Sequence, residues 1–253
     1  MNLSIPPLSP ADIARAAISY RNRHGFDRID PKAVLSDMDG VLYDTMPRHT
    51  AAWFRLATEL GLQAQQDEFY AFEGMTGHDT INLLYRRAKG IEISREESAA
   101  LYRRKAQYIA ECGDPPKMPM AEEALRRFID CGLQCVLVTG SGQPTTLQLI
   151  SRDFPGIFAD DHRVTALDVV HGKPAPEPYL KGLAKVGAQP FEAIVIENAP
   201  LGIQSAAAAR CFVVAVATGP IPIEQLAEAG ADIILPSMEA LYGAVPDILA
   251  SLK

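Results

Sequence analysis

Short apolar runs recur along the chain, and longer segments with helical periodicity separate them. The runs that predict strands lie near residues 33–36, 135–138, 163–166, 194–196, 213–216 and 232–235. Segments with helical spacing, such as 121–130 and 201–209, lie between most of them. Strands that alternate with helices are typical of a parallel sheet with helices on both faces. The expected fold class is therefore α/β.

The alternation is interrupted between residues 46 and 117, where the pattern is helical. The segment 50–60 places its large apolar residues on one stripe, and further helices are predicted at 80–88 and 95–112. An inserted helical block of this size predicts a small cap domain that closes over the sheet. Such a cap excludes water from a site and completes it on closing.

The chain therefore divides into three parts. Residues 31–45 and 118–253 form the core, residues 46–117 form the helical cap, and residues 1–30 form an N-terminal extension. An amphipathic helix is predicted over 10–23. The extension is expected to pack against the core or to form an oligomer contact, and no chemistry is assigned to it.

Composition and charge restrict the class of protein. The chain has 253 residues, of which 48% are hydrophobic and 22% are charged, which is typical of a globular protein. Its net charge of −7 argues against nucleic acid as a partner, because phosphate backbones require basic surfaces. The segment 46–117 carries ten basic and ten acidic residues, so the negative excess lies in the rest of the chain.

The sequence also indicates where the protein works. No apolar run approaches the roughly 20 residues that a membrane-spanning helix needs, and the first residues lack the pattern of a secretory signal. The four cysteines show no Cys-x-x-Cys spacing, and we expect reduced, buried thiols. These features predict a cytoplasmic protein without a membrane partner, either a monomer or a small homo-oligomer.

Two aspartates directly follow the first predicted strand. Asp37 and Asp39 stand two positions apart, so they share one face if the extended geometry continues, and Gly40 then allows a sharp turn. Crowded carboxylates favour a hard divalent cation such as Mg²⁺, and an aspartate can also act as a nucleophile. A plain Asp-Gly turn is the alternative interpretation of this segment alone.

Further polar groups follow the later strands. The second predicted strand ends at Thr139 and the fourth ends at Glu197 and Asn198, while Lys173 lies between them in a proline-rich segment. In parallel α/β sheets, ligands bind beyond the carboxyl ends of the strands. Together these residues supply a nucleophile, a phosphate-binding hydroxyl, a cation and metal ligands. The constellation indicates phosphoryl transfer.

With these motif regions in order, the chain resembles the haloacid dehalogenase superfamily, in the C1 subgroup that carries a helical cap after the first motif. The likeness covers roughly residues 31–250 and is strongest to beta-phosphoglucomutase-like proteins, including a pyrophosphatase-like branch. The segments 172–174 and 195–202 carry that closer similarity. The resemblance implies a Rossmann-like parallel sheet core with an inserted helical cap.

The resemblance also implies roles for the motif residues. Asp37 would attack phosphorus and form an aspartyl-phosphate, and Asp39 would act as general acid and then as general base. Thr139, through its hydroxyl and backbone N–H, and Lys173 would hold the oxygens of the transferring group.

The implied cofactor is Mg²⁺, bound by Asp37, the backbone carbonyl of Asp39, Glu197 and Asn198. Much of the superfamily has an acidic pair where this chain has Glu197-Asn198, so the site lacks one negative charge. Glu73, in the cap's specificity loop, is expected to reach the metal when the cap closes, mainly from the pyrophosphatase-like resemblance. A solvent-facing glutamate is the alternative.

Four further residues are expected to bind substrate. Gly140 and Ser141 directly follow Thr139. His49 and Lys105 match positions that link the cap to the catalytic pocket in the mutase-like subgroup. A packing or capping role is the alternative for His49, and a charged helix face is the alternative for Lys105.

The sequence therefore predicts a Mg²⁺-dependent phosphohydrolase of a small phosphorylated metabolite, with inorganic pyrophosphate as a candidate. Beta-phosphoglucomutase is the alternative, because the two activities differ only in the group that accepts the phosphoryl group. Similar mutases carry basic residues on the cap loop, whereas Glu73, Met75 and Gly77 leave this loop without a cation. A non-catalytic phosphate-ligand binding protein is a minor alternative.

Overall fold

The core of the protein is a six-stranded parallel sheet, seen in a computed structural model that describes residues 5, 7–142 and 144–252. The strands are β1 (Ala33–Ser36), β2 (Gln134–Val138), β3 (Arg163–Val164), β4 (Ala193–Glu197), β5 (Phe212–Val216) and β6 (Ile233–Leu235). Their order is β3-β2-β1-β4-β5-β6, so β1 lies between β2 and β4. The predicted α/β class is confirmed.

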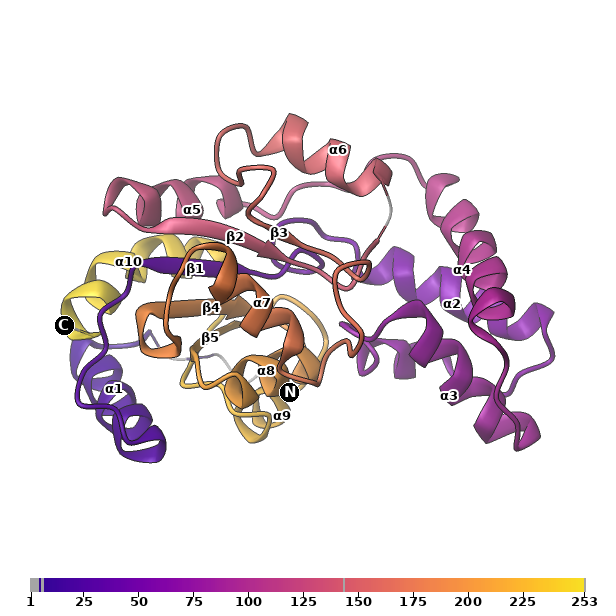
Figure 1. Cartoon of the computed structure of the whole chain (residues 1–253), viewed down its shortest axis with the longest axis horizontal. Helices are drawn as coiled ribbons and strands as arrows, with labels where there is room; N and C mark the ends of the chain where they lie inside the picture. The colour runs from indigo at the N-terminus through magenta and orange to yellow at the C-terminus, as the bar shows by residue number, and fades with distance from the viewer. Residues whose placement is uncertain (1–4, 6, 143, 253) are drawn as a thin grey trace.

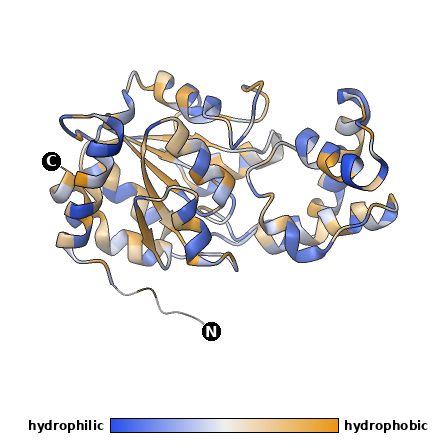
Figure 2. Cartoon of the chain, turned by 90° about the horizontal axis from the view of Figure 1, so that it is seen from below, coloured by the Kyte–Doolittle hydropathy of each residue, from blue (hydrophilic) through white to orange (hydrophobic). Residues whose placement is uncertain are grey.

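Helices cover both faces of the sheet (Figure 1). One face packs against α1 (Pro10–His24), α5 (Ala121–Asp130), α6 (Pro144–Asp153) and α10 (Met238–Leu252). The other packs against α7 (Glu177–Lys185), α8 (Pro200–Ala208) and α9 (Ile223–Glu228), with the short η2 (Pro190–Glu192) leading into β4. Because both faces are covered, the strands are apolar almost throughout, as their colour in Figure 2 shows.

The helix of the N-terminal extension packs on the core, mainly along α10. Ser9 begins it with a capping box, in which its side chain accepts from the N–H of Asp12. The buried Tyr20 hydroxyl donates to the carbonyl oxygen of Arg210 at 2.6 Å. These contacts supply the packing role that was one of the two expected for this helix.

Four elements between β1 and α5 lie to one side of the sheet, beyond the ends of its strands (Figure 1). They are α2 (Met46–Glu59), η1 (Gln66–Tyr70), α3 (Gly77–Lys89) and α4 (Arg95–Ala110). They enclose a separate hydrophobic cluster around Trp53, Leu56 and Phe69. We refer to them as the cap. The first cap helix begins at Met46 rather than at residue 50, because Pro47 is tolerated in the first turn of a helix.

Two other expectations differ from the structure. Strand β3 ends at Val164 rather than at residue 166, because the Asp168 carboxylate accepts hydrogen bonds from the N–H and hydroxyl of Thr165 and forms a turn. All four cysteines are free, but only two are buried. Cys112 and Cys131 are exposed, because they lie at the ends of helices rather than in the sheet. No helix of the described chain is long and apolar enough to cross a membrane.

Candidate active site

The sheet places the motif residues at one edge. Asp37 follows β1, Thr139 follows β2, and Glu197 ends β4, and these three strands are direct neighbours. Residues Ser36 and Ile196 are paired in the parallel register, which brings the segments after them side by side. The polar side chains gather where parallel strands of an α/β sheet bind ligands.

Lys173 links two carboxylates of this edge, those of Asp37 and Glu197. Its Nζ donates to Asp37 Oδ1 and to Glu197 Oε1, both at 2.6 Å, and to the carbonyl oxygen of Val138 at 3.3 Å. All three charged side chains are almost completely buried. The ammonium group thus spends its three donors on fixed protein acceptors.

Electrostatics tie Asp37 and Lys173 together. Burial raises the pKa of Asp37, and the neighbouring Glu197 and Asp39 add to this, while Lys173 opposes it. Burial alone would lower the pKa of Lys173, but the attraction of Asp37 and Glu197 outweighs it and raises that pKa. Lys173 therefore stays cationic over the physiological range.

Glu197 is held by protein groups on both carboxylate oxygens. Oε1 accepts from Lys173 and from the Tyr179 hydroxyl at 2.7 Å. Oε2 accepts from the backbone N–H groups of Asn198, at 2.9 Å, and Ala199, at 3.3 Å. This arrangement fixes Lys173 in place and leaves Glu197 turned toward the protein rather than toward an open coordination position.

The side-chain oxygen of Asn198, unlike those of Glu197, accepts no hydrogen bond from the described protein groups. Among the residues that the structure describes, this Oδ1 is one of three buried side-chain atoms without a hydrogen-bond partner. Gly40 makes room for this side chain, since a Cβ at Gly40 would lie 2.0 Å from Asn198 Nδ2. A buried amide oxygen without a donor is costly unless a cation binds it. Together with the Asp37 carboxylate at the end of the neighbouring strand and the backbone carbonyl of Asp39, this oxygen forms a donor set that fits Mg²⁺.

The loop after β2 fits the expected anion site only in part. The Thr139 hydroxyl accepts from the N–H of Ser141 at 3.0 Å, which curls the loop around the strand end. The N–H of Thr139, however, donates to the carbonyl oxygen of Val164 at 2.9 Å. The expectation that this N–H holds substrate is therefore wrong, because sheet pairing with β3 uses it.

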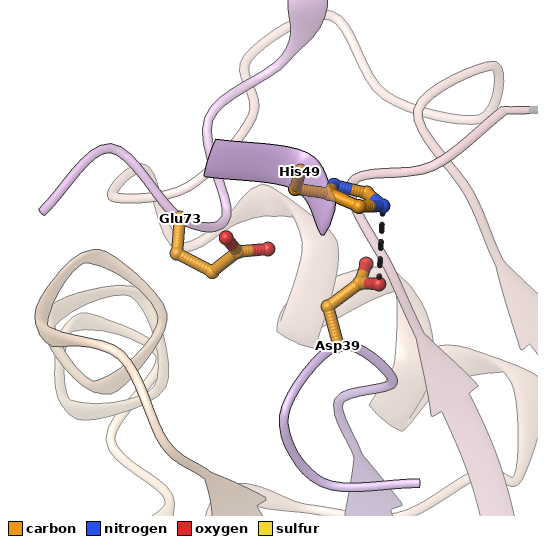
Figure 3. Close-up of side chains that lie close together, drawn as sticks. All are labelled: Asp39, His49 and Glu73. Carbon is orange, nitrogen blue, oxygen red and sulfur yellow. Dashed lines mark ion pairs between the residues drawn. The ribbon is translucent and has the colours of Figure 1, made fainter. Parts of the chain in front are cut away.

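Three side chains meet where the cap faces the core (Figure 3). Asp39 comes from the loop after β1, His49 from α2, and Glu73 from the loop after η1. Donor atoms of the three lie within 4.8 Å of one another, and His49 Nε2 is 3.7 Å from Asp39 Oδ1. The Thr45 hydroxyl also donates to Asp39 Oδ1. Cap and core therefore build this part of the site together.

Burial shifts the pKa values of three titratable side chains of the cap. It raises the pKa of Glu73 well above its usual value, helped by the charges of Asp39 and Asp37. It lowers the pKa of His49 to about 4, and the charge of Lys105 adds to this. It lowers the pKa of Lys105 to about 8, against the attraction of Glu73 and Asp39. Glu73 is partly buried in the site, so the solvent-facing alternative does not describe the closed form.

Lys105 lies inside the site rather than on a charged helix face. It is 1% exposed, and its Nζ lies 3.2 Å from His49 Nδ1 and 5.0 Å from the centre of the Trp53 ring. His49 and Trp53, four residues apart on α2, line the same cavity. Tyr179 and Thr45 bind the carboxylates of Glu197 and Asp39 from positions outside the motifs, and no sequence pattern pointed to them.

The site is nearly closed. A cavity of about 30 Å³ lies between cap and core, with Asp37, Asp39, Glu73, Lys105 and Gly140 among its lining residues. Such a volume holds roughly one or two water molecules. A second cavity of about 240 Å³ adjoins it and shares Asp39, His49 and Ser141 with it.

Comparisons with known proteins agree with this geometry. The haloacid dehalogenase-like hydrolase family matches residues 31–210. Hexitol phosphatase A of Escherichia coli (strain K12) is 32% identical over 211 residues, which cover 83% of this chain and 93% of that protein. Beta-phosphoglucomutase of Bacillus subtilis (strain 168) is 24% identical over 195 residues, 74% of this chain and 84% of that protein.

A solved structure gives the same result. A beta-phosphoglucomutase candidate from Bacteroides vulgatus superimposes with a TM-score of 0.93 at 42% identity, over 97% of this chain and 100% of that one. Fold, site and relatives together define a phosphoryl-transfer enzyme. The chain belongs to the haloacid dehalogenase-like hydrolase family, in its helical-cap, beta-phosphoglucomutase-like branch.

Proposed function

We propose that the protein is a Mg²⁺-dependent phosphohydrolase that acts on a phosphate monoester of a small metabolite. One observation carries the proposal: the buried Asp37 carboxylate lies 2.6 Å from the fixed cation of Lys173 at the carboxyl end of β1. This arrangement offers a nucleophilic oxygen beside a positive charge that neutralises the transferring group.

The reaction has two steps at phosphorus. A carboxylate oxygen of Asp37 forms the new P–O bond while the bond to the leaving oxygen breaks, and Asp39 gives its proton to that oxygen. Asp39 then takes a proton from water, which attacks the aspartyl-phosphate and releases phosphate. Lys173, beside Asp37, would neutralise charge on the transferring group, and the Thr139 hydroxyl would donate to a phosphoryl oxygen.

Mg²⁺ would be held by Asp37, the backbone carbonyl of Asp39 and the amide oxygen of Asn198. Bound there, it would neutralise charge on the phosphoryl oxygens. Glu73 stays a proposed further ligand from the cap. For Glu197 we propose that it acts through Lys173, because its carboxylate is engaged by Lys173, Tyr179 and the backbone.

The shape of the site favours an ester over inorganic pyrophosphate. Because Asp39 protonates the leaving oxygen, the leaving group lies on the side of Asp39, where the cavity of about 240 Å³ begins. Met38, Ile109 and Leu149 give this cavity apolar walls. A carbon skeleton would fill it, whereas pyrophosphate would not. The similarity to a hexitol phosphatase supports a sugar or polyol phosphate as substrate.

Mutase activity is the second candidate, supported by the likeness to beta-phosphoglucomutases. It needs a cation for the second phosphate of its intermediate. The loop around Glu73 lacks one, although Lys105 supplies a buried cation from α4. The first reaction step is the same in both candidates, and water competes with a sugar hydroxyl in the second.

Phosphate release with Mg²⁺ tests the proposal. Hexitol phosphates, hexose phosphates, other small esters and pyrophosphate are compared, with Asp37→Asn as control. We expect Mg²⁺-dependent release from one group of esters and none from the control. Fast release from pyrophosphate alone would overturn the ester proposal. Slow release everywhere, together with isomerisation of beta-glucose 1-phosphate, would establish the mutase instead.

A further inference from the structure

We propose that Asp39, His49 and Glu73 form a second cation position, which binds a transition metal ion such as Zn²⁺ and inhibits the enzyme. It differs from the Mg²⁺ position of the proposed function in its nitrogen donor: Glu73 is a proposed ligand of both positions, whereas His49 belongs to the second position alone. The inference rests on that function only in taking Asp39 as the general acid and base.

The three side chains converge from both parts of the molecule. Figure 3 shows the Asp39 carboxylate below the His49 ring, with the Glu73 carboxylate directed toward the space between them. Their donor atoms lie within 4.8 Å of one another, so small side-chain rotations bring all three within coordination distance of one ion. Asp39 is buried, and His49 and Glu73 are partly buried, which limits competition from solvent.

The donor types select the ion. One imidazole nitrogen and two carboxylate oxygens, with room for a water as fourth ligand, form a donor set that Zn²⁺ accepts in a tetrahedral arrangement. Mg²⁺ prefers oxygen ligands in an octahedron and binds imidazole poorly. A nitrogen donor therefore separates this position from the oxygen-only set of Asp37, Asn198 and the Asp39 carbonyl.

The Asp39 residue contributes different atoms to the two positions. Its backbone carbonyl belongs to the proposed Mg²⁺ set, whereas its carboxylate belongs to the second position. An ion on this carboxylate occupies the oxygen lone pairs that would carry the proton. Asp39 could then neither donate a proton to the leaving oxygen nor accept one from water. Because His49 and Glu73 belong to the cap, the same ion also ties the closed cap to the core.

Lys105 opposes the ion. Its Nζ lies 3.2 Å from His49 Nδ1, on the side of the ring away from Asp39. This contact orients the ring, but the positive charge repels a divalent cation. The removal of this charge should strengthen binding, whereas the removal of a ligand should weaken it. Substitution of Lys105 and substitution of a ligand are thus expected to change the metal affinity in opposite directions.

The experiment is a Co²⁺ titration followed by visible absorption, in excess Mg²⁺, with Zn²⁺ displacement of the bound Co²⁺. Cys112→Ser and Cys131→Ser form the background, because both thiols are exposed and bind the same metals. Asp37→Asn is the matched control, since it removes a ligand of the Mg²⁺ position and leaves the second position intact.

We expect one Co²⁺ per chain in the background protein and in Asp37→Asn, with the strong absorption of a four-coordinate ion. His49→Gln and Glu73→Gln should each weaken binding at least about tenfold, and Lys105→Met should tighten it. If His49→Gln fails to fold by circular dichroism, His49→Asn replaces it. Zn²⁺ should inhibit phosphate release even at saturating Mg²⁺, and less so in the Glu73→Gln variant.

Two results would overturn the proposal. The first is Co²⁺ affinity that does not change in His49→Gln and Glu73→Gln. The second is Co²⁺ that Mg²⁺ displaces in the background protein and that Asp37→Asn no longer binds, which would place it at the Mg²⁺ position. The titration needs no turnover, so it tests metal binding even if no ester is hydrolysed. A failure of the proposed function can therefore be distinguished from a failure of the second cation position.

Discussion

The edge of the sheet and the inner face of the cap each bury one lysine, and their surroundings differ. Lys173 forms ion pairs with Asp37 and Glu197, whose attraction raises its pKa against the effect of burial. Lys105 forms no ion pair within the described part of the chain, and burial lowers its pKa to about 8. The Trp53 ring, 5.0 Å away, gives it a weaker cation–π contact.

This difference separates two uses of a buried charge. The core balances Lys173 with fixed carboxylates, so the site is organised before any substrate arrives. Lys105 has no carboxylate within ion-pair distance among the described residues, and only the more distant charges of Glu73 and Asp39 attract it, so its ammonium group can still pair with an anion. On the proposed function, the core would supply the chemistry, and the cap would supply a cation that a phosphorylated ligand neutralises.

The largest effect is expected at Asp37. In Asp37→Asn the amide cannot attack phosphorus, and phosphate release should fall by at least about 10⁴-fold. Phosphate release and circular dichroism, measured together, separate lost chemistry from lost folding. Substantial turnover in a folded variant would show that Asp37 is not the nucleophile.

The next effect is expected at Lys173. Lys173→Met removes the cation that neutralises charge on the transferring group, so kcat should fall by about 10²–10³-fold. It also leaves Asp37 and Glu197 buried without a partner, which should destabilise the fold by about 3–5 kcal/mol. Urea unfolding measures the second effect. Equal stability of variant and wild type would contradict the description of these residues as a tightly coupled set.

A smaller effect is expected at Lys105 on the cap. Lys105→Met should raise KM about tenfold with little change in stability, because it removes a charged contact to substrate and breaks no ion pair. Since the pKa of Lys105 is lowered to about 8, its cation is present below that pH and lost above it. KM of the wild type should therefore rise above pH 8, whereas KM of the variant should not.

Arg103→Met is the matched control for that profile, because Arg103 lies on the same helix but is exposed. A rise in KM above pH 8 that persists in Lys105→Met would assign the titration to another group.

The smallest effect concerns the contact between cap and core. A Cβ at Gly140 would lie 3.1 Å from the carbonyl oxygen of Gly74, which is backbone and cannot turn aside. Gly140→Ala should therefore hinder closure and lower kcat a few-fold. Gly142→Ala is the control, since its Cβ would meet the exposed side chain of Leu167, which can move. Equal rates in both variants would argue against a role of this contact in closure.

The sequence predicted the core more completely than the cap. Each strand of the parallel sheet is encoded locally by an apolar run. Asp37 and Thr139 directly follow two of these strands and Glu197 ends a third, so the three residues could be placed at one edge. The environments of Lys105 and Glu73 depend on how the cap seats on the core. The local sequence pattern does not encode that contact. Because Lys105 stands beside two exposed arginines, its sequence context predicts a position on a solvated helix face.

Two details of the core also escaped prediction. The N–H of Thr139 is used by β3, a strand of only two residues whose end depends on the turn at Asp168. The Glu197 carboxylate turns toward Lys173 and Tyr179 because α7 brings the tyrosine hydroxyl under the end of β4. Both depend on contacts between segments that are distant in sequence.

The small volume of the active-site cavity has a consequence for timing. The cavity beside Asp37 has space for only about one or two water molecules, so on the proposed function a phosphoryl group enters it only when the cap moves away from the core. Each turnover then requires one opening to admit the substrate and one to discharge the products. The frequency of cap opening sets a ceiling on turnover, however fast the bonds at phosphorus are made and broken.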